Sequence, residues 1–169
     1  MTNALAWLED SWLGVWVREY PSLFAFPFIL FLHTLGLAML AGVSVAIDVW
    51  LLRNRTLGNG ARMTGLIRTM WLGFGINTVS GLLLLVAYPA KALTNPVFYT
   101  KMLLVGLGVL SVARINREMF PAGVAVAGAV VTAAARRWAT VSFVAWMGTV
   151  LTGRLLAYTY HVLFAYELK

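Results

Sequence analysis

Residues 23–52 read LFAFPFILFLHTLGLAMLAGVSVAIDVWLL, and the ionisable side chains among them are His33 and Asp48. A helix of about 20 apolar residues is long enough to cross about 30 Å of hydrocarbon. This stretch therefore predicts a membrane-spanning helix, and it places inside that helix two groups that a bilayer disfavours.

Three more apolar runs follow, so that the chain has four predicted spans, at about 23–52, 66–88, 97–115 and 138–164. Hydrophobic residues make up 61% of the 169 residues and charged residues 11%, which is more apolar surface than one small water-soluble core can bury. We therefore predict an all-α integral membrane protein. Residues 21–169 are expected to form a single four-helix bundle without a separate soluble domain.

The positions of the arginines predict the orientation of the spans. They gather after the first span and after the third, whereas the second loop offers only Lys91. The two clusters are Arg53, Arg55, Arg62 and Arg68, then Arg114, Arg117, Arg136 and Arg137. Loops rich in Lys and Arg stay in the cytoplasm, so we predict a multi-pass protein of the bacterial inner membrane with both termini periplasmic. The net charge of +7 then belongs to one membrane face, and no nucleic-acid partner is expected.

Two segments outside the spans need their own interpretation. Within residues 1–20, Trp7, Trp12 and Trp16 lie among leucines, a pattern typical of an amphipathic helix in the membrane interface. Residues 119–135 are mostly Ala, Gly and Val. If they crossed the membrane, the arginines that follow would face outward, so we predict a cytoplasmic loop, with or without a helix on the membrane surface.

The two histidines of the chain are the strongest candidates for a functional site. His33 lies 20 residues before Arg53 and His161 lies 24 residues after Arg137, or about 30 and 36 Å along a helix. Both are therefore expected near the outer leaflet, on the first and fourth spans. Imidazole is a common axial ligand of haem iron, and helical bundles often hold cofactors between facing helices. One functional histidine, or no cofactor role for either, remains the alternative.

Three further residues suit the surroundings of such a site. Arg154, Tyr158 and His161 are spaced by four and three residues and so share one face of the fourth span. Arg154 is too deep to reach the surface and needs a partner, and Lys101 lies near the outer end of the third span. Both cations suit the propionates of a non-covalently bound haem b, and a quinone or a lipid headgroup would suit them equally. Lys101 alone could also extend to the membrane surface.

Asp48 and the missing cysteines restrict the chemistry. Asp48 lies 15 residues from His33, about 22 Å along a helix, so we expect it to pair with Arg53 or Arg68 at the inner surface. The chain has no cysteine, which excludes thiolate metal sites, iron–sulfur clusters and covalently attached haem. Asp48 and the histidines are expected at opposite faces, so a hydrolytic triad is not predicted.

Several stretches resemble a known family. They are Tyr20-Pro21, His33-Thr34-Leu35-Gly36-Leu37-Ala38, Asp48 to Arg53, Ser80 to Leu84, Lys101 and Gly153 to Tyr158. They are similar to small four-helix bacterial membrane proteins of unassigned function with a His-x-x-Gly-x-Ala…Asp-x-x-Leu pattern. That family is loosely similar to four-helix b-type cytochromes and copper-resistance membrane proteins. The resemblance implies a redox or metal-linked role.

The sequence thus favours a membrane electron-transfer subunit over a stand-alone enzyme. It would bind haem b at His33 and His161, with Lys101, Arg154 and Tyr158 beside the cofactor, and exchange electrons with a quinone or with other membrane or periplasmic redox subunits. The alternative is a cofactor-free anchor or accessory subunit of a larger membrane complex. A small transporter is a weaker interpretation, because broken helices and paired repeats are not evident.

Overall fold

The computed structural model describes residues 7–119 and 126–167, with side chains up to residue 156 in the second stretch. The elements are α2 (Trp12–Glu19), α3 (Phe26–Leu37), the π-helical segment η1 (Ala38–Gly42), α4 (Val43–Arg53), α5 (Gly60–Ala87), α6 (Pro89–Leu93), α7 (Pro96–Met119) and α8 (Ala133–Glu167). Within the described residues, four helical stretches are long and apolar enough to cross a membrane: Phe26–Arg53, Gly60–Ala87, Pro96–Met119 and Ala133–Leu156. The predicted all-α membrane bundle is confirmed.

The spans extend further at their arginine-rich ends than the apolar runs predict. The α5 helix begins at Gly60, where the side chain of Asn59 accepts a hydrogen bond from the backbone N–H of Arg62 at 3.2 Å. Helix α7 continues to Met119, so Arg114 lies on a helix and not in a loop. Its guanidinium group stacks over the Trp138 ring of α8 at 5.4 Å from the ring centroid. Hydropathy marks only the lipid-facing length of a helix, and backbone hydrogen bonding carries the helix beyond it.

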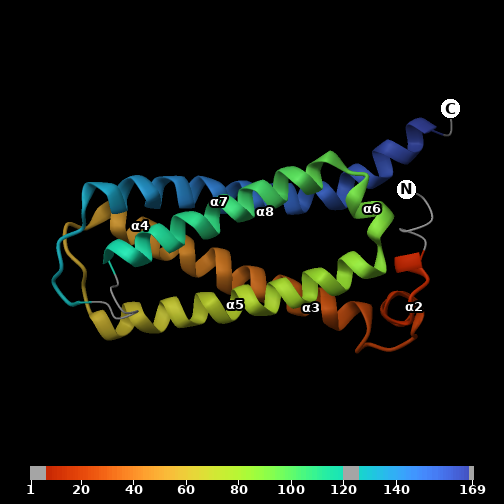
Figure 1. Ribbon diagram of the computed structural model, residues 1–169, viewed down its shortest axis with the longest axis horizontal. Helices are drawn as coiled ribbons and strands as arrows, with labels where there is room; N and C mark the ends of the chain where they lie inside the picture. The colour runs from red at the N-terminus through yellow and green to blue at the C-terminus, as the bar shows by residue number, and fades with distance from the viewer. Residues whose placement is uncertain (1–6, 120–125, 168–169) are drawn as a thin grey trace.

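The first span crosses the bundle diagonally. Its first half, α3, packs on α5, and its second half, α4, packs on α8, while α7 and α8 pack along each other. Figure 1 shows this course: the orange segment runs from beside α5 at one end to beside α8 at the other. The π-helical segment η1 lies where the first span changes partner. Such wide turns interrupt the regular hydrogen-bond ladder and often occur at functional sites.

Small residues allow the closest helix contacts. A Cβ atom added to Gly73 of α5 would lie 2.6 Å from Met39 Cβ in η1, and one added to Gly36 would lie 2.6 Å from the backbone nitrogen of Asn77. Between α7 and α8, a Cβ atom added to Gly108 of α7 would lie 2.8 Å from the ring of Trp146. Membrane helices lack a hydrophobic driving force for association, so such close backbone approach is a main source of their stability.

The two arginine-rich loops meet at one end of the bundle, which we call the inner end. The backbone N–H of Leu57 donates to the carbonyl of Ala129 at 2.7 Å, and that of Gly128 donates to the carbonyl of Leu57 at 2.8 Å. Gly128 adopts a φ of 77°, a conformation that glycine accepts without strain. Residues 126–132 therefore form a loop that bonds to the first connection. Of the predicted loop over residues 119–135, Met119 belongs to α7, residues 133–135 belong to α8, and residues 120–125 lie outside the described residues.

The opposite end, the outer end, carries α2, α6 and the last turns of α8 (Figure 1). Ser11 begins α2: its hydroxyl group donates to the carbonyl of Leu8 at 2.6 Å and accepts from the N–H of Gly14 at 3.2 Å. Helix α2 is therefore shorter than the predicted helix over residues 1–20, because the chain turns at Ser11. Its exposed face carries Trp12, while Val17 is buried with Ala87 of α5.

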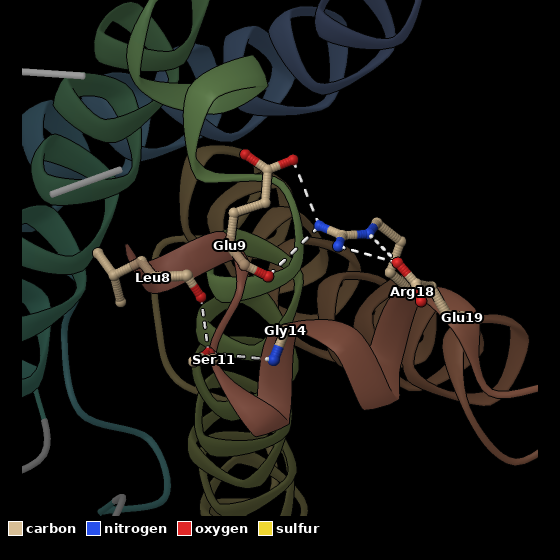
Figure 2. Close-up of polar contacts among 6 residues, drawn as sticks. All are labelled: Leu8, Glu9, Ser11, Gly14, Arg18 and Glu19. Carbon is tan, nitrogen blue, oxygen red and sulfur yellow. Dashed lines mark hydrogen bonds and ion pairs between the residues drawn. The ribbon is translucent and has the colours of Figure 1, made fainter. Parts of the chain in front are cut away.

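Arg18 ties α2 to the turn that precedes it. Its guanidinium group lies 3.3 Å from the Glu9 carboxylate and 3.0 Å from that of Glu19, as Figure 2 shows. The hydrogen bond to Glu19 raises the pKa of Arg18, so this guanidinium group stays charged.

Buried apolar residues form two separate clusters. The larger one fills the inner half with residues from η1, α4, α5, α7, α8 and both inner loops. Its members include Leu40, Ile47, Leu51, Leu57, Ile67, Met70, Val112, Ile115, Val131 and Trp146. The smaller one, at the outer end, joins α2, α3 and α5 through Val17, Ile29 and Ala87. The four spans thus share a common core in the inner half, and the described residues of α7 and α8 contribute no buried member to the outer cluster.

Candidate functional site

His33 lies on α3 in the outer half, with its ring against α5. Its Nδ1 atom is 3.2 Å from the carbonyl oxygen of Asn77 and 3.2 Å from the hydroxyl oxygen of Ser80. The Asn77 side-chain nitrogen donates to the backbone carbonyl of His33 at 2.8 Å. A Cβ atom on Gly81 would lie 3.1 Å from the ring, so glycine leaves the space that the imidazole occupies. Asn77 of α5 thus bonds to the neighbouring helix α3, and its partner is His33.

The two shortest contacts of Nδ1 favour the tautomer that carries the ring proton on this atom. The Asn77 carbonyl can only accept a hydrogen bond, and the Ser80 hydroxyl group donates its own proton to the carbonyl of Ile76 at 2.6 Å. Both of these atoms can accept from Nδ1 at 3.2 Å, whereas the Asn77 amide nitrogen, which keeps a second N–H after bonding to the His33 carbonyl, lies farther from Nδ1, at 3.4 Å. Nε2 then carries the lone pair, and it forms no hydrogen bond with any described residue. A histidine held through one ring nitrogen with the other free is the usual arrangement of a metal-bound imidazole.

Lys101 on α7 approaches this histidine from the other helix pair. Its ammonium group is close enough to act electrostatically on the His33 ring. The side chain is half-buried, and it forms no hydrogen bond or ion pair within the described part of the chain. A half-buried cation without a protein partner favours an anion beside it.

Of the three candidate site residues on α8, the structure describes the side chain of Arg154 only. Arg154 is exposed on that helix and makes no hydrogen bond or ion pair with a described residue. The side chains of Tyr158 and His161 lie outside the described residues, although the helix itself continues to Glu167. In Figure 1 this last part of α8 extends beyond the other spans. Pairing of His161 with His33 therefore stays a prediction.

The predicted salt bridge between Asp48 and Arg53 or Arg68 is wrong. It is 1% exposed within the inner core, whereas Arg53 and Arg68 are exposed at the surface, and no ion pair of Asp48 occurs among the described residues. Five residues separate Asp48 from Arg53, which turns the two side chains about 140° apart around the helix. The polar neighbour of the Asp48 carboxyl group is Ser142 on α8, a residue that the sequence did not single out.

The fold and the His33 site define an integral, multi-pass, all-α membrane protein with a histidine held between its first two spans. Within the described residues no cluster of three or more His, Cys, Asp or Glu side chains could hold a metal ion, whereas haem iron needs only one or two axial ligands from a protein. Comparison of the chain with protein-family models, curated proteins and solved structures finds no match.

Proposed function

We propose that the protein is a membrane electron-transfer subunit of the b-type cytochrome kind, with haem b bound near the outer end of the bundle. The observation that carries the proposal is the state of His33: α5 holds Nδ1, while Nε2 has no partner among the described residues. A carbonyl that accepts from Nδ1 fixes the ring and makes Nε2 a better ligand. Haem would supply reversible one-electron transfer at this position.

Other residues fit the same cofactor. Lys101 acts electrostatically on His33 and has no anionic partner in the described residues, so it suits a haem propionate. His161 is the proposed second axial ligand, with Arg154 and Tyr158 on the same helix, and a bound quinone would use the same cations.

The packing of the outer half also favours a cofactor there. Among the described side chains, which for α8 end at Leu156, its buried apolar cluster joins α2, α3 and α5. Within those residues the two helix pairs share less buried core at the outer end than at the inner end, and an apolar macrocycle would complete the contact between them. We further propose that this end faces the periplasm of a bacterial inner membrane, where other redox subunits would exchange electrons with it.

The test is the absorption spectrum of the purified full-length protein, with a pyridine haemochrome assay. We expect a haem b spectrum that is lost in His33→Ala and in His161→Ala, whereas Asp10→Asn on the exposed N-terminal segment keeps it. Lys101→Met should keep the haem and lower its reduction potential, because a positive charge near haem stabilises the reduced form. Colourless pure protein from haem-replete cells would refute the proposal.

A second candidate is a cofactor-free accessory subunit of a larger membrane complex. The exposed aromatic surface at the outer end favours it: Trp12 is 77% exposed, Leu23 81% and Phe24 72%. Exposed apolar patches of this kind mark contacts with lipid or with other proteins. Co-purification of a defined assembly in mild detergent, without a chromophore that belongs to this chain, would favour the second candidate over the first.

A further inference from the structure

A group of buried polar atoms without partners lies in the inner half of the bundle, away from His33. Ser44 and Asp48 of α4 are each 1% exposed, and Ser142 of α8 is fully buried. Within the described residues, the hydroxyl oxygens of both serines and the Oδ2 atom of Asp48 make no hydrogen bond of good geometry, although the Ser142 hydroxyl group faces the Asp48 carboxyl group. Buried polar atoms in proteins are nearly always satisfied, so three orphans in one place need an explanation.

The orphan hydroxyl groups are not a general property of this bundle. Ser111 and Thr149 are also fully buried, and each donates to a carbonyl one turn earlier in its own helix, at 2.7 and 2.9 Å. Ser44 and Ser142 have the same option and do not use it. Their hydroxyl groups therefore remain available to a group between α4 and α8.

A small cavity adjoins Asp48. It has a volume of about 10 Å³ and is lined by Ser44, Asp48 and Asn116 together with apolar residues of α4, α5 and α7. That volume is close to the minimum that one water molecule needs, and the three polar side chains are enough partners for it. A divalent cation, which binds six or more oxygen atoms, does not fit this site.

In the part of the chain that the structure describes, no charged side chain balances the Asp48 carboxyl group. Asp48 is the one ionisable residue that lines the cavity, and Asn116 is the polar contribution of α7. From α8 the facing group is Ser142. The arginines close in sequence to the residues of this site are exposed: Arg53 on α4, Arg68 on α5, Arg114 and Arg117 on α7, and Arg137 on α8. Arg136 of α8 donates to the carbonyl of Asn54. An isolated carboxylate in such surroundings is costly, and the group neutralises instead.

We propose that Asp48, Ser44, Ser142 and the adjoining cavity form a proton-binding site in the inner half of the membrane. A hydronium ion from the inner aqueous side gives one proton to the Asp48 carboxylate, which yields the neutral acid and one water molecule. The acid and a water molecule in the cavity share hydrogen bonds with the two serine hydroxyl groups and the Asn116 amide. The site does not depend on haem, because it lies in the other half of the bundle.

Infrared spectroscopy of the full-length protein in lipid nanodiscs tests this site. At neutral pH we expect the carbonyl band of a protonated, buried carboxylic acid, sensitive to deuterium oxide and lost reversibly on alkaline titration. The band should be absent in Asp48→Asn and retained in Asp10→Asn, which changes an exposed aspartate. Ser142→Ala should keep the band and shift its frequency, and this variant covers the case in which Asp48→Asn does not fold.

Two results would overturn the proposal. One is a spectrum without such a band at neutral pH, which means that Asp48 is ionised. The other is a band that appears only when sodium is replaced by choline, which means that the site takes a monovalent metal ion and not a proton. Potassium chloride at equal ionic strength is the control for a general salt effect.

Discussion

The contact between Gly73 and the first span yields the sharpest test of the packing. An alanine Cβ at this position would lie 2.6 Å from Met39 Cβ, 2.8 Å from the backbone nitrogen of Leu40 and 3.0 Å from the carbonyl oxygen of Gly36. The first distance is 0.8 Å short of the 3.4 Å at which ordinary van der Waals contact begins. Two of the three atoms belong to the backbone, so no side-chain rotation can relieve the clash, and α5 has to move away from η1.

The size of the effect follows from two opposing terms. Overpacking a well-filled contact costs about 1–3 kcal/mol, and we take the upper part of that range because backbone atoms are involved. Replacing glycine by alanine inside a helix gains at most about 1 kcal/mol. Gly73→Ala should therefore destabilise the bundle by about 2 kcal/mol, or roughly 30-fold in the folding equilibrium constant.

Gly75→Ala is the matched control. Gly75 lies two residues further along the same helix, and nothing lies within 4 Å of a Cβ atom added there. Unfolding of each variant by a denaturing detergent in mixed micelles, followed by tryptophan fluorescence, gives the comparison. Gly75→Ala should be neutral or slightly stabilising. Equal stabilities of the two alanine variants, within about 0.5 kcal/mol, would refute the proposed close contact between η1 and α5.

Three further predictions concern the two ends of the bundle. Ser11→Ala removes the N-cap of α2 and should destabilise that helix by about 1 kcal/mol, as measured by hydrogen exchange of its backbone amides. Arg136→Leu removes the donor to the carbonyl of Asn54 at 2.7 Å and should speed proteolysis of the inner loops, whereas the exposed Arg137→Leu should not. Because the chain has no cysteine, single cysteines report topology: an impermeant thiol reagent on intact cells should label Asp10→Cys and leave Val126→Cys unmodified.

The sequence predicts the number and type of spans but not their internal geometry. Four apolar runs predict the four-helix bundle, and two arginine clusters predict that the two inner loops lie at the same end of it. Both predictions are possible because hydrophobicity and loop charge determine how helices insert into a membrane. Hydropathy does not report the hydrogen-bond register of a helix. The π-helical segment at Ala38–Gly42, and the change of partner from α5 to α8, were therefore not predictable.

At the candidate sites too, the sequence identifies individual polar residues but not how they pair. His33 and Asn77 both stand out as polar residues in apolar runs, yet their pairing depends on how α3 and α5 rotate against each other. Ser142 gives no signal at all, since a single serine in a membrane helix is ordinary. The expected salt bridge of Asp48 was wrong because spacing along the chain was used without the angle around the helix.

The two proposed sites, at His33 and Asp48, lie on the same span, so the haem assay and the infrared assay are informative only if the sites are independent. Fifteen residues separate His33 from Asp48, or about 22 Å along the helix. At that distance, and with an effective dielectric constant of about 20, two unit charges interact by about 0.8 kcal/mol, less than a tenfold change in any equilibrium. Removing the imidazole should therefore leave the infrared band of Asp48 in place, and Asp48→Asn should leave haem binding intact. If one substitution abolished both signals, it would have disrupted the fold and tested neither site.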